Sequence, residues 1–170
     1  ASNTKASMDL LVHHLNNKPY SQILGGKSFM LGGSTNLTEQ SDGVFSGDLS
    51  GIAVKTMRPW VKPWYFPPAE LALIENWEEK ISVLGKASLK QDIRMLGGVP
   101  TWLLIFFDEL YKLYPSNNHN IKSLFPRMEM LVHGGVPFGP YKNRFEDLFA
   151  NSGVDFREVY PASEAFIALA

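Results

Sequence analysis

The sequence has no cysteine among its 170 residues, no excess of either charge and no long apolar run. The absence of cysteine excludes disulfides, thiolate metal sites and thiol nucleophiles. Sixteen basic and seventeen acidic residues nearly cancel, so the basic field that nucleic-acid binding usually needs is missing. The longest apolar run, at residues 102–107, is far shorter than the roughly 20 residues of a membrane span. We therefore expect neither a nucleic-acid partner nor a membrane partner.

The remaining composition is typical of a globular chain with a core of its own. Hydrophobic residues make up 45% of the sequence, which at this length allows a sizeable core. No signal-peptide pattern opens the sequence. A single glycosylation sequon, Asn36-Leu-Thr38, is a tripeptide that often arises by chance. We expect a cytoplasmic location.

Apolar periodicity predicts helices and strands that alternate along the chain. Helical spacing is found at residues 8–15, 70–84, 101–114 and 141–150, and short apolar runs typical of strands at 28–31, 128–133 and 156–160. Gly85 is expected to cap the second helix and Pro100 to begin the third. Residues 58–68 contain four prolines and are expected to form no regular element. Alternation without repeats predicts an α/β fold with a predominantly parallel sheet and flanking helices.

The last two predicted strands are followed by polar, glycine-containing segments. His133-Gly-Gly-Val-Pro-Phe-Gly-Pro-Tyr141 follows one strand, and Tyr160-Pro-Ala-Ser-Glu164 follows the other. A helix between two strands makes a βαβ unit, whose strands are parallel and whose crossover is right-handed. The two segments are then expected to open on the same edge of the sheet, where open α/β sheets bind ligands. This edge is a candidate nucleotide or phosphate site.

These two segments resemble the GH3 family of acyl acid-amido synthetases, which are adenylate-forming enzymes. Three further segments carry the resemblance in the same order: Ser46-Gly-Asp-Leu-Ser-Gly-Ile52, Asn76-Trp-Glu-Glu-Lys-Ile81 and Gly98-Val-Pro-Thr-Trp102. Together they cover most of residues 25–170. The resemblance implies an enzyme that uses ATP and Mg²⁺ to adenylate a small carboxylic acid and then transfers the acyl group to an amine or amino acid.

Members of this family are several hundred residues long. Their phosphate loop precedes the matched region, and a Tyr-Arg-x-Gly-Asp segment with a mobile lid follows it. The resemblance therefore implies that residues 1–170 are an internal portion of the adenylate-forming N-terminal domain. We expect this portion to be inactive by itself and open to self-association through its cut surfaces. The alternative is a non-catalytic module that binds a nucleotide or a small molecule.

The resemblance also implies roles for the residues after the last strand. Tyr160 would lie near the adenine, and Ser163 and Glu164 would face the phosphates and the metal as the catalytic pair. Mg²⁺ prefers one or two carboxylates together with phosphates and water, which suits Glu164. The alternative is a Ser-Glu pair in a solvated loop. Ala165 departs from the glycine that many members carry there.

The segment after the first of these strands offers three candidate nucleotide contacts. Gly134 and Gly135 lack a Cβ and would let the backbone approach a planar base. A tight turn that needs positive φ is the alternative, and both readings are compatible. His133 is interpreted as a structural residue rather than a general base, because adenylation starts from an ionised carboxylate and expels pyrophosphate.

Two further residues are candidate walls of the acid pocket. Val99 and Trp102 belong to a segment that lies near the acyl acid in the family, and apolar side chains suit such a pocket. For Trp102 the alternative, packing in the core beneath a buried helix, has equal weight.

His13 and His14 are adjacent on a predicted helix and point about 100° apart, so they do not form a metal pair.

Overall fold

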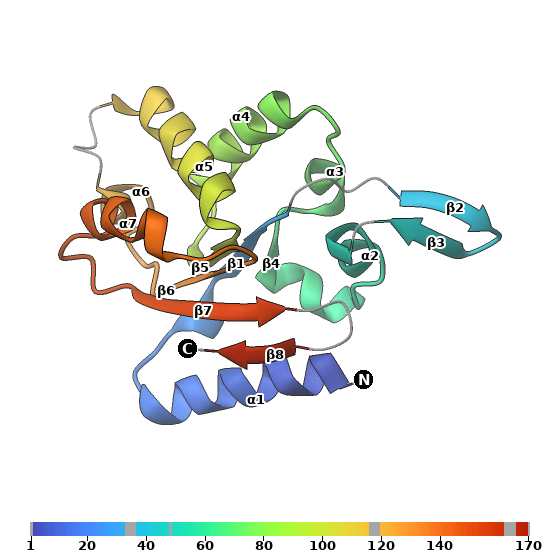
Figure 1. Cartoon of the computed structure of the whole chain (residues 1–170), viewed down its shortest axis with the longest axis horizontal. Helices are drawn as coiled ribbons and strands as arrows, with labels where there is room; N and C mark the ends of the chain where they lie inside the picture. Colours follow the sequence, from blue (N-terminus) through green and yellow to red (C-terminus); the bar gives the residue numbers. More distant parts are fainter. Residues whose placement is uncertain (1, 33–36, 48, 116–119, 162–165, 170) are drawn as a thin grey trace.

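The computed structural model describes residues 2–32, 37–47, 49–115, 120–161 and 166–169. A six-stranded sheet runs through the centre in the order β4-β1-β5-β6-β7-β8 (Figure 1). The first five of these strands are parallel, and β8 is antiparallel to β7. The strands are β1 Lys27–Leu31, β4 Tyr65–Phe66, β5 Ile93–Gly98, β6 Met130–Gly134, β7 Asp155–Pro161 and β8 Phe166–Leu169. The predicted α/β fold with a predominantly parallel sheet is confirmed.

Helices cover the sheet, and a separate hairpin projects from it. α4 and α5 lie together on one side, whereas α1 runs along β8 on the side away from them (Figure 1). The helices are α1 Ser2–Asn17, α2 Leu49–Lys55, α3 Ala69–Ala72, α4 Trp77–Ser88, α5 Pro100–Leu113, α6 Ile121–Leu124 and α7 Lys142–Leu148. Short 3₁₀-helices are η1 Ile23–Gly25, η2 Pro59–Trp64 and η4 Gly139–Tyr141. The hairpin pairs β2 Leu37–Ser41 with β3 Val44–Gly47.

The helix predicted over residues 70–84 is divided in two by the structure. α3 ends at Ala72, and α4 begins at Trp77 with Asn76 as its N-cap. The Asn76 side chain accepts a hydrogen bond from the Glu79 backbone N–H at 2.9 Å, as capping asparagines do. Gly85 is not the C-cap, because α4 continues to Ser88. It is instead a contact point with α5, since a Cβ at Gly85 would lie 3.2 Å from Leu113 Cδ1.

The proline-rich segment also departs from its prediction. Residues 59–64 form η2, and Tyr65–Phe66 form β4, which pairs in parallel with β1. The Phe66–Pro67 peptide bond is cis. Prolines are tolerated in this segment because η2 is short and β4 is a two-residue edge strand. Few backbone N–H groups are needed there as hydrogen-bond donors.

The core lies between the sheet and the pair α4 and α5. Phe29 of β1 packs edge-on against Phe66 and Phe106, with ring centroids 4.8 and 5.1 Å apart. Phe107 makes similar contacts with Phe145 and Phe149 at 6.1 and 5.7 Å. Phe29, Phe66, Phe106, Phe107 and Phe145 are essentially inaccessible to solvent. These rings join β1, α5 and α7 into one core.

The direction of the chain across the sheet reverses beside β1. The chain passes from β1 to β4 on one side and then returns across β1 to β5, β6 and β7 on the other. Consecutive connections therefore leave β1 and β5 in opposite directions. Such a switch point leaves a crevice at the carboxyl ends of the two strands, which is where open α/β sheets bind ligands.

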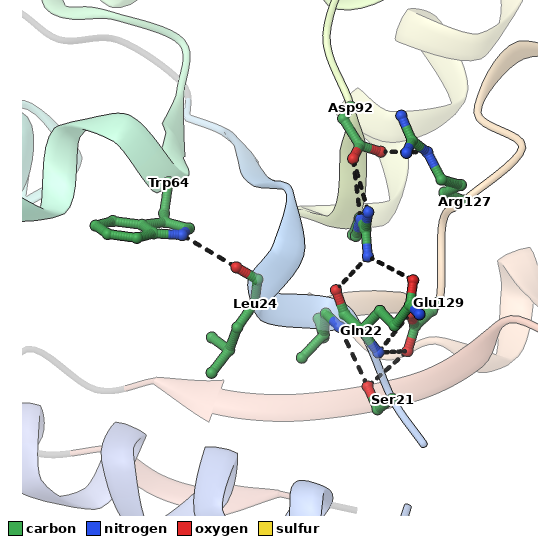
Figure 2. A network of polar contacts seen from close by, with 9 residues as sticks. Ser21, Gln22, Leu24, Trp64, Asp92, Arg127 and Glu129 are labelled. Atoms are coloured by element: carbon green, nitrogen blue, oxygen red, sulfur yellow. Dashed lines mark hydrogen bonds and ion pairs between the residues drawn. The ribbon is translucent and has the colours of Figure 1, made fainter. Parts of the chain in front are cut away.

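A polar network fixes the opposite, amino-terminal edge of the sheet (Figure 2). The buried Arg94 guanidinium donates to the Asp92 carboxylate at 2.9 Å and to the Gln22 carbonyl at 2.6 Å. Arg127 pairs with the other Asp92 oxygen at 3.0 Å. The Glu129 carboxylate accepts from the Gln22 backbone N–H at 2.9 Å. These bonds tie the segment before β1 to the starts of β5 and β6.

Candidate functional site

The two segments singled out in the sequence begin inside neighbouring strands, because β6 extends to Gly134 and β7 extends to Pro161. β6 and β7 are adjacent and parallel, and Gly134 pairs in register with Val159. Tyr160 is the next residue and its side chain is 62% exposed. The prediction that these segments start from one edge of the sheet, on neighbouring strands, is confirmed. Ser163 and Glu164 lie outside the described residues.

A cavity of about 250 Å³ lies at this edge, at the switch point. The carboxyl ends of three strands contribute to its wall through Leu31, Gly98 and Gly134, and Val99 and Gly135 extend the wall into the loops. Further walls come from the α3–α4 region and from residues beside the cis peptide bond: Tyr65, Pro67, Ala72, Lys80 and Leu84. Segments far apart in the sequence therefore meet in one small, mostly apolar cavity.

Gly134 and Gly135 are required by the backbone for two different reasons. A Cβ at Gly134 would lie 2.1 Å from the Val159 carbonyl oxygen on the neighbouring strand. Gly135 has a φ of +84°, a conformation that side-chain-bearing residues rarely adopt. The positive-φ alternative therefore holds at Gly135, whereas Gly134 is required by the close approach of the neighbouring strand. Because both glycines also line the cavity, close approach of a ligand remains compatible with it.

His133 is among the residues that line the cavity, and its side chain is buried. It is 3% exposed and stacks on Phe138 with centroids 3.8 Å apart. Burial lowers the pKa of His133 below its ordinary value of 6.5, and the nearby Glu158 opposes this only in part. Its Nδ1 is buried and has no hydrogen-bond partner among the residues that the structure describes. The ring is held by stacking rather than by hydrogen bonds.

The two candidate walls of the acid pocket are in different places. Val99 lines the cavity. Trp102 belongs to α5 and packs against Trp77 of α4, with ring centroids 5.6 Å apart. It is not among the residues that line the cavity, so this contact favours the packing alternative for Trp102.

Two polar residues of the cavity were not singled out in the sequence. Lys80 is only 2% exposed, and its Nζ donates a hydrogen bond to the Ala72 carbonyl at 2.8 Å. Tyr65 lines the same cavity, and burial raises the pKa of its hydroxyl, so the hydroxyl stays protonated. The helical pattern contained a signal for Lys80. It lies three residues after Trp77 and four before Leu84, on the apolar face of α4.

A second, larger cavity of about 630 Å³ adjoins the first. The two share Val54, Tyr65 and Pro67 as walls. The second cavity has charges of both signs at its rim, from Lys55, Lys62, Glu70 and Glu75. An apolar cavity and a mixed-charge cavity thus lie side by side.

The match to a known protein family covers most of the chain. Residues 4–154 match the sequence model of the GH3 family N-terminal domain. The chain belongs to the GH3 family. No curated protein and no solved structure matches it. Tyr160 and the Ser-Glu pair follow the matched region of this GH3 chain.

The residues present fit a nucleotide at the edge formed by β6 and β7. The buried Nδ1 atom of His133 has no hydrogen-bond partner in the described part of the chain. Buried polar atoms of this kind are rare unless a ligand or a water molecule forms the missing hydrogen bond. For Mg²⁺, the described part of the chain contains no cluster of three His, Asp or Glu side chains. Mg²⁺ bound to phosphates needs only one or two carboxylates, so a single glutamate would suffice.

Within the described ranges, the GH3 chain has no helix with the length and hydropathy needed to cross a bilayer.

Proposed function

We propose that this GH3 chain is part of an ATP-dependent enzyme that adenylates a small carboxylic acid and conjugates it to an amine or amino acid in the cytoplasm. The observation that carries the proposal is the small apolar cavity at the switch point, bounded by the two-glycine loop after β6. A cavity of this kind suits the side group of an acid, and the glycine loop beside it suits a nucleotide.

In this proposal, one group of residues binds the carboxylic acid and another binds the nucleotide. Val99 and the strand ends enclose the acid and exclude water from it. Gly134 and Gly135 present backbone to the nucleotide, the neutral His133 offers a ring nitrogen, and Tyr160 lies at the exposed rim. Adenylation joins the carboxylate to the α-phosphate and releases pyrophosphate, so positioning and charge stabilisation supply most of the rate.

In this proposal Ser163 and Glu164 face the phosphates and Mg²⁺. The metal, when bound, neutralises charge that builds up on the departing pyrophosphate. Glu164 would hold the ion, and the Ser163 hydroxyl would donate to a phosphate oxygen. The adjoining cavity supports the second half of the reaction. Its lysines and glutamates suit the two charges of a zwitterionic amino acid, and an amine bound there would lie beside the acyl group across the shared wall.

The test is ATP–pyrophosphate exchange with a panel of small aromatic and aliphatic acids, using the product of the complete open reading frame. Glu164→Gln keeps the shape and removes the charge, so we expect exchange to fall by about 10²-fold, with partial recovery at higher Mg²⁺. Glu146→Gln, at an exposed carboxylate on α7, is the matched control and should leave exchange unchanged.

Two results would contradict the proposal. Normal exchange and an unchanged Mg²⁺ dependence in Glu164→Gln would return this residue to a solvated loop. Nucleotide binding without exchange for any acid would favour a non-catalytic binding module. The 170-residue chain alone should give no exchange above background, because positioning by the family's phosphate loop and lid is part of the mechanism.

A further inference from the structure

A chain of hydrogen bonds connects the last turn of α1 to the sheet. His14 Nε2 lies 3.2 Å from Ser21 Oγ. Ser21 Oγ in turn lies 2.5 Å from a carboxylate oxygen of Glu129, a contact drawn in Figure 2. Glu129 directly precedes β6. The helix is therefore linked, through the segment before η1, to the start of a central strand.

The hydrogen-bond chain fixes the tautomer of His14. A carboxylate only accepts hydrogen bonds, so the Ser21 hydroxyl donates its proton to Glu129. Ser21 Oγ then acts as an acceptor for its other contacts, the Ile23 backbone N–H at 3.3 Å and His14 Nε2. The His14 ring must therefore carry its proton on Nε2, which leaves Nδ1 without one.

The other ring nitrogen of His14 is enclosed. The residue is only 7% exposed, and its Nδ1 is buried without a hydrogen-bond partner among the residues that the structure describes. A second proton would turn Nδ1 into a charged donor that faces no acceptor. An unpaired buried charge costs far more than an unpaired neutral atom. The surroundings of His14 therefore favour the neutral ring.

The charged groups that act on His14 do not change this preference. They are Glu129 before β6, Asp155 and Arg157 on β7, and Lys18 just after α1. The two acids favour the charged ring, and the two bases oppose it. The strand beside α1, β8, has no titratable side chain. Burial is the largest influence and lowers the pKa of His14 below its ordinary value of 6.5.

Two further contacts hold α1 in place, and neither responds to mild acid. The helix packs along β8 (Figure 1), whose residues are apolar. Lys18 forms an ion pair with Asp155 of β7. Lysine and aspartate ordinarily keep their charges between pH 7.5 and 5.5, whereas histidine changes its charge in this range. Of these three links, the one through His14 is therefore the acid-sensitive one.

We propose that His14 is an acid-sensitive latch, which holds the end of α1 on the sheet while the ring is neutral and releases it when the ring is protonated. A released histidine takes up a proton below about pH 6.5. The stabilisation of α1 should therefore be complete above this pH and decrease as the pH falls through it. The inference is independent of the proposed function and gives a role to one member of the His13-His14 pair.

The experiment is hydrogen–deuterium exchange of the 170-residue chain at pH 7.5 and 5.5, read by mass spectrometry and corrected for the intrinsic pH dependence of exchange. Residues 8–17 report on α1, and residues 101–113 report on the core helix α5. At pH 5.5 a released histidine is charged about ten times as often as it is neutral. We therefore expect the protection of residues 8–17 to fall by up to about 10-fold, while α5 remains the more protected helix.

Two variants separate titration of His14 from other effects of acid. His14→Gln keeps a neutral donor near the position of Nε2, so the protection of α1 should become nearly independent of pH. His13→Gln changes the exposed neighbour, which contacts Asn17 instead, and should keep the pH dependence of the wild type. If His14→Gln does not fold, the ring ¹⁵N shifts of the wild type carry the test. They should show a neutral Nε2–H ring for His14 at pH 7.5.

Three outcomes overturn the latch. The first is the same loss of α1 protection in the wild type and in a folded His14→Gln protein. The second is equal protection of α1 and α5 at pH 5.5, because the whole chain would then open together. The third is a His14 ring that is charged, or protonated on Nδ1 alone, at pH 7.5.

Discussion

Replacement of Gly134 by alanine tests whether this glycine serves the fold, the ligand or both. Gly134 ends β6 and pairs with Val159 of β7. A Cβ here would lie 2.1 Å from the Val159 carbonyl oxygen and 3.1 Å from its carbonyl carbon. Carbon and oxygen atoms in close contact stay about 3.3 Å apart. The alanine variant must therefore separate two hydrogen-bonded strands by more than an ångström, since backbone cannot rotate away as a side chain can.

The magnitude follows from comparison with two glycines that come next in the chain, Gly135 and Gly139. Overpacking against a rigid neighbour costs typically about 1–3 kcal/mol and occasionally more, so we expect Gly134→Ala to lose about 3 kcal/mol of unfolding free energy. Gly135→Ala has its nearest neighbour at 3.4 Å but a φ of +84°, which costs about 1–2 kcal/mol. Gly139→Ala meets nothing within 4 Å and should stay within about 0.5 kcal/mol of the wild type.

Urea unfolding followed by circular dichroism gives these three values, and melting temperatures give an independent order. For a chain of this size, 1 kcal/mol corresponds to about 2–4 °C. The expected order of stability is Gly139→Ala, then Gly135→Ala, then Gly134→Ala. A Gly134→Ala protein as stable as Gly139→Ala would refute the strand-packing argument and leave ligand approach as the only reason for this glycine. Stability equal to wild type in Gly135→Ala would likewise refute the argument from positive φ.

Two further changes test the buried polar groups at opposite edges of the sheet. Because burial lowers the pKa of His133 in the folded state, the unfolded chain takes up this proton first, and the unfolding free energy should fall as the pH drops below about 6.5. His133→Phe should lose less stability between pH 7.5 and 5 than the wild type in urea titrations, and an equal loss would contradict this. Arg94→Met should reduce the unfolding free energy by about 2–4 kcal/mol, because it leaves the Gln22 carbonyl and one Asp92 oxygen without their donor. The exposed Arg144→Met is its control, and equal effects of the two would show that the buried network adds nothing.

The sequence predicted the elements whose pattern is local. Strands 128–133 and 156–160 appear as β6 and β7, and residues 101–114 appear as α5 from Pro100 to Leu113. The sequence pattern did not predict β5, because Arg94, Gly97 and Gly98 interrupt its apolar run. Each interruption has a tertiary cause. Arg94 donates a hydrogen bond to the Gln22 carbonyl before β1, and a Cβ at Gly97 would lie 2.7 Å from the Met30 side chain of β1. Neither neighbour is visible from residues 93–98 alone.

In the candidate site, too, local sequence patterns predicted some features, whereas others depend on contacts between distant segments. The glycine loop after β6 could be predicted, because a βαβ pattern places both loops on one edge. The cavity could not, because its far wall is built by Tyr65 and Pro67 from the proline-rich segment and by Lys80 from a helix that follows it. The apolar periodicity of α4 places Lys80 on the inner face, but only the return of the chain across β1 brings that face to the carboxyl ends of β5 and β6.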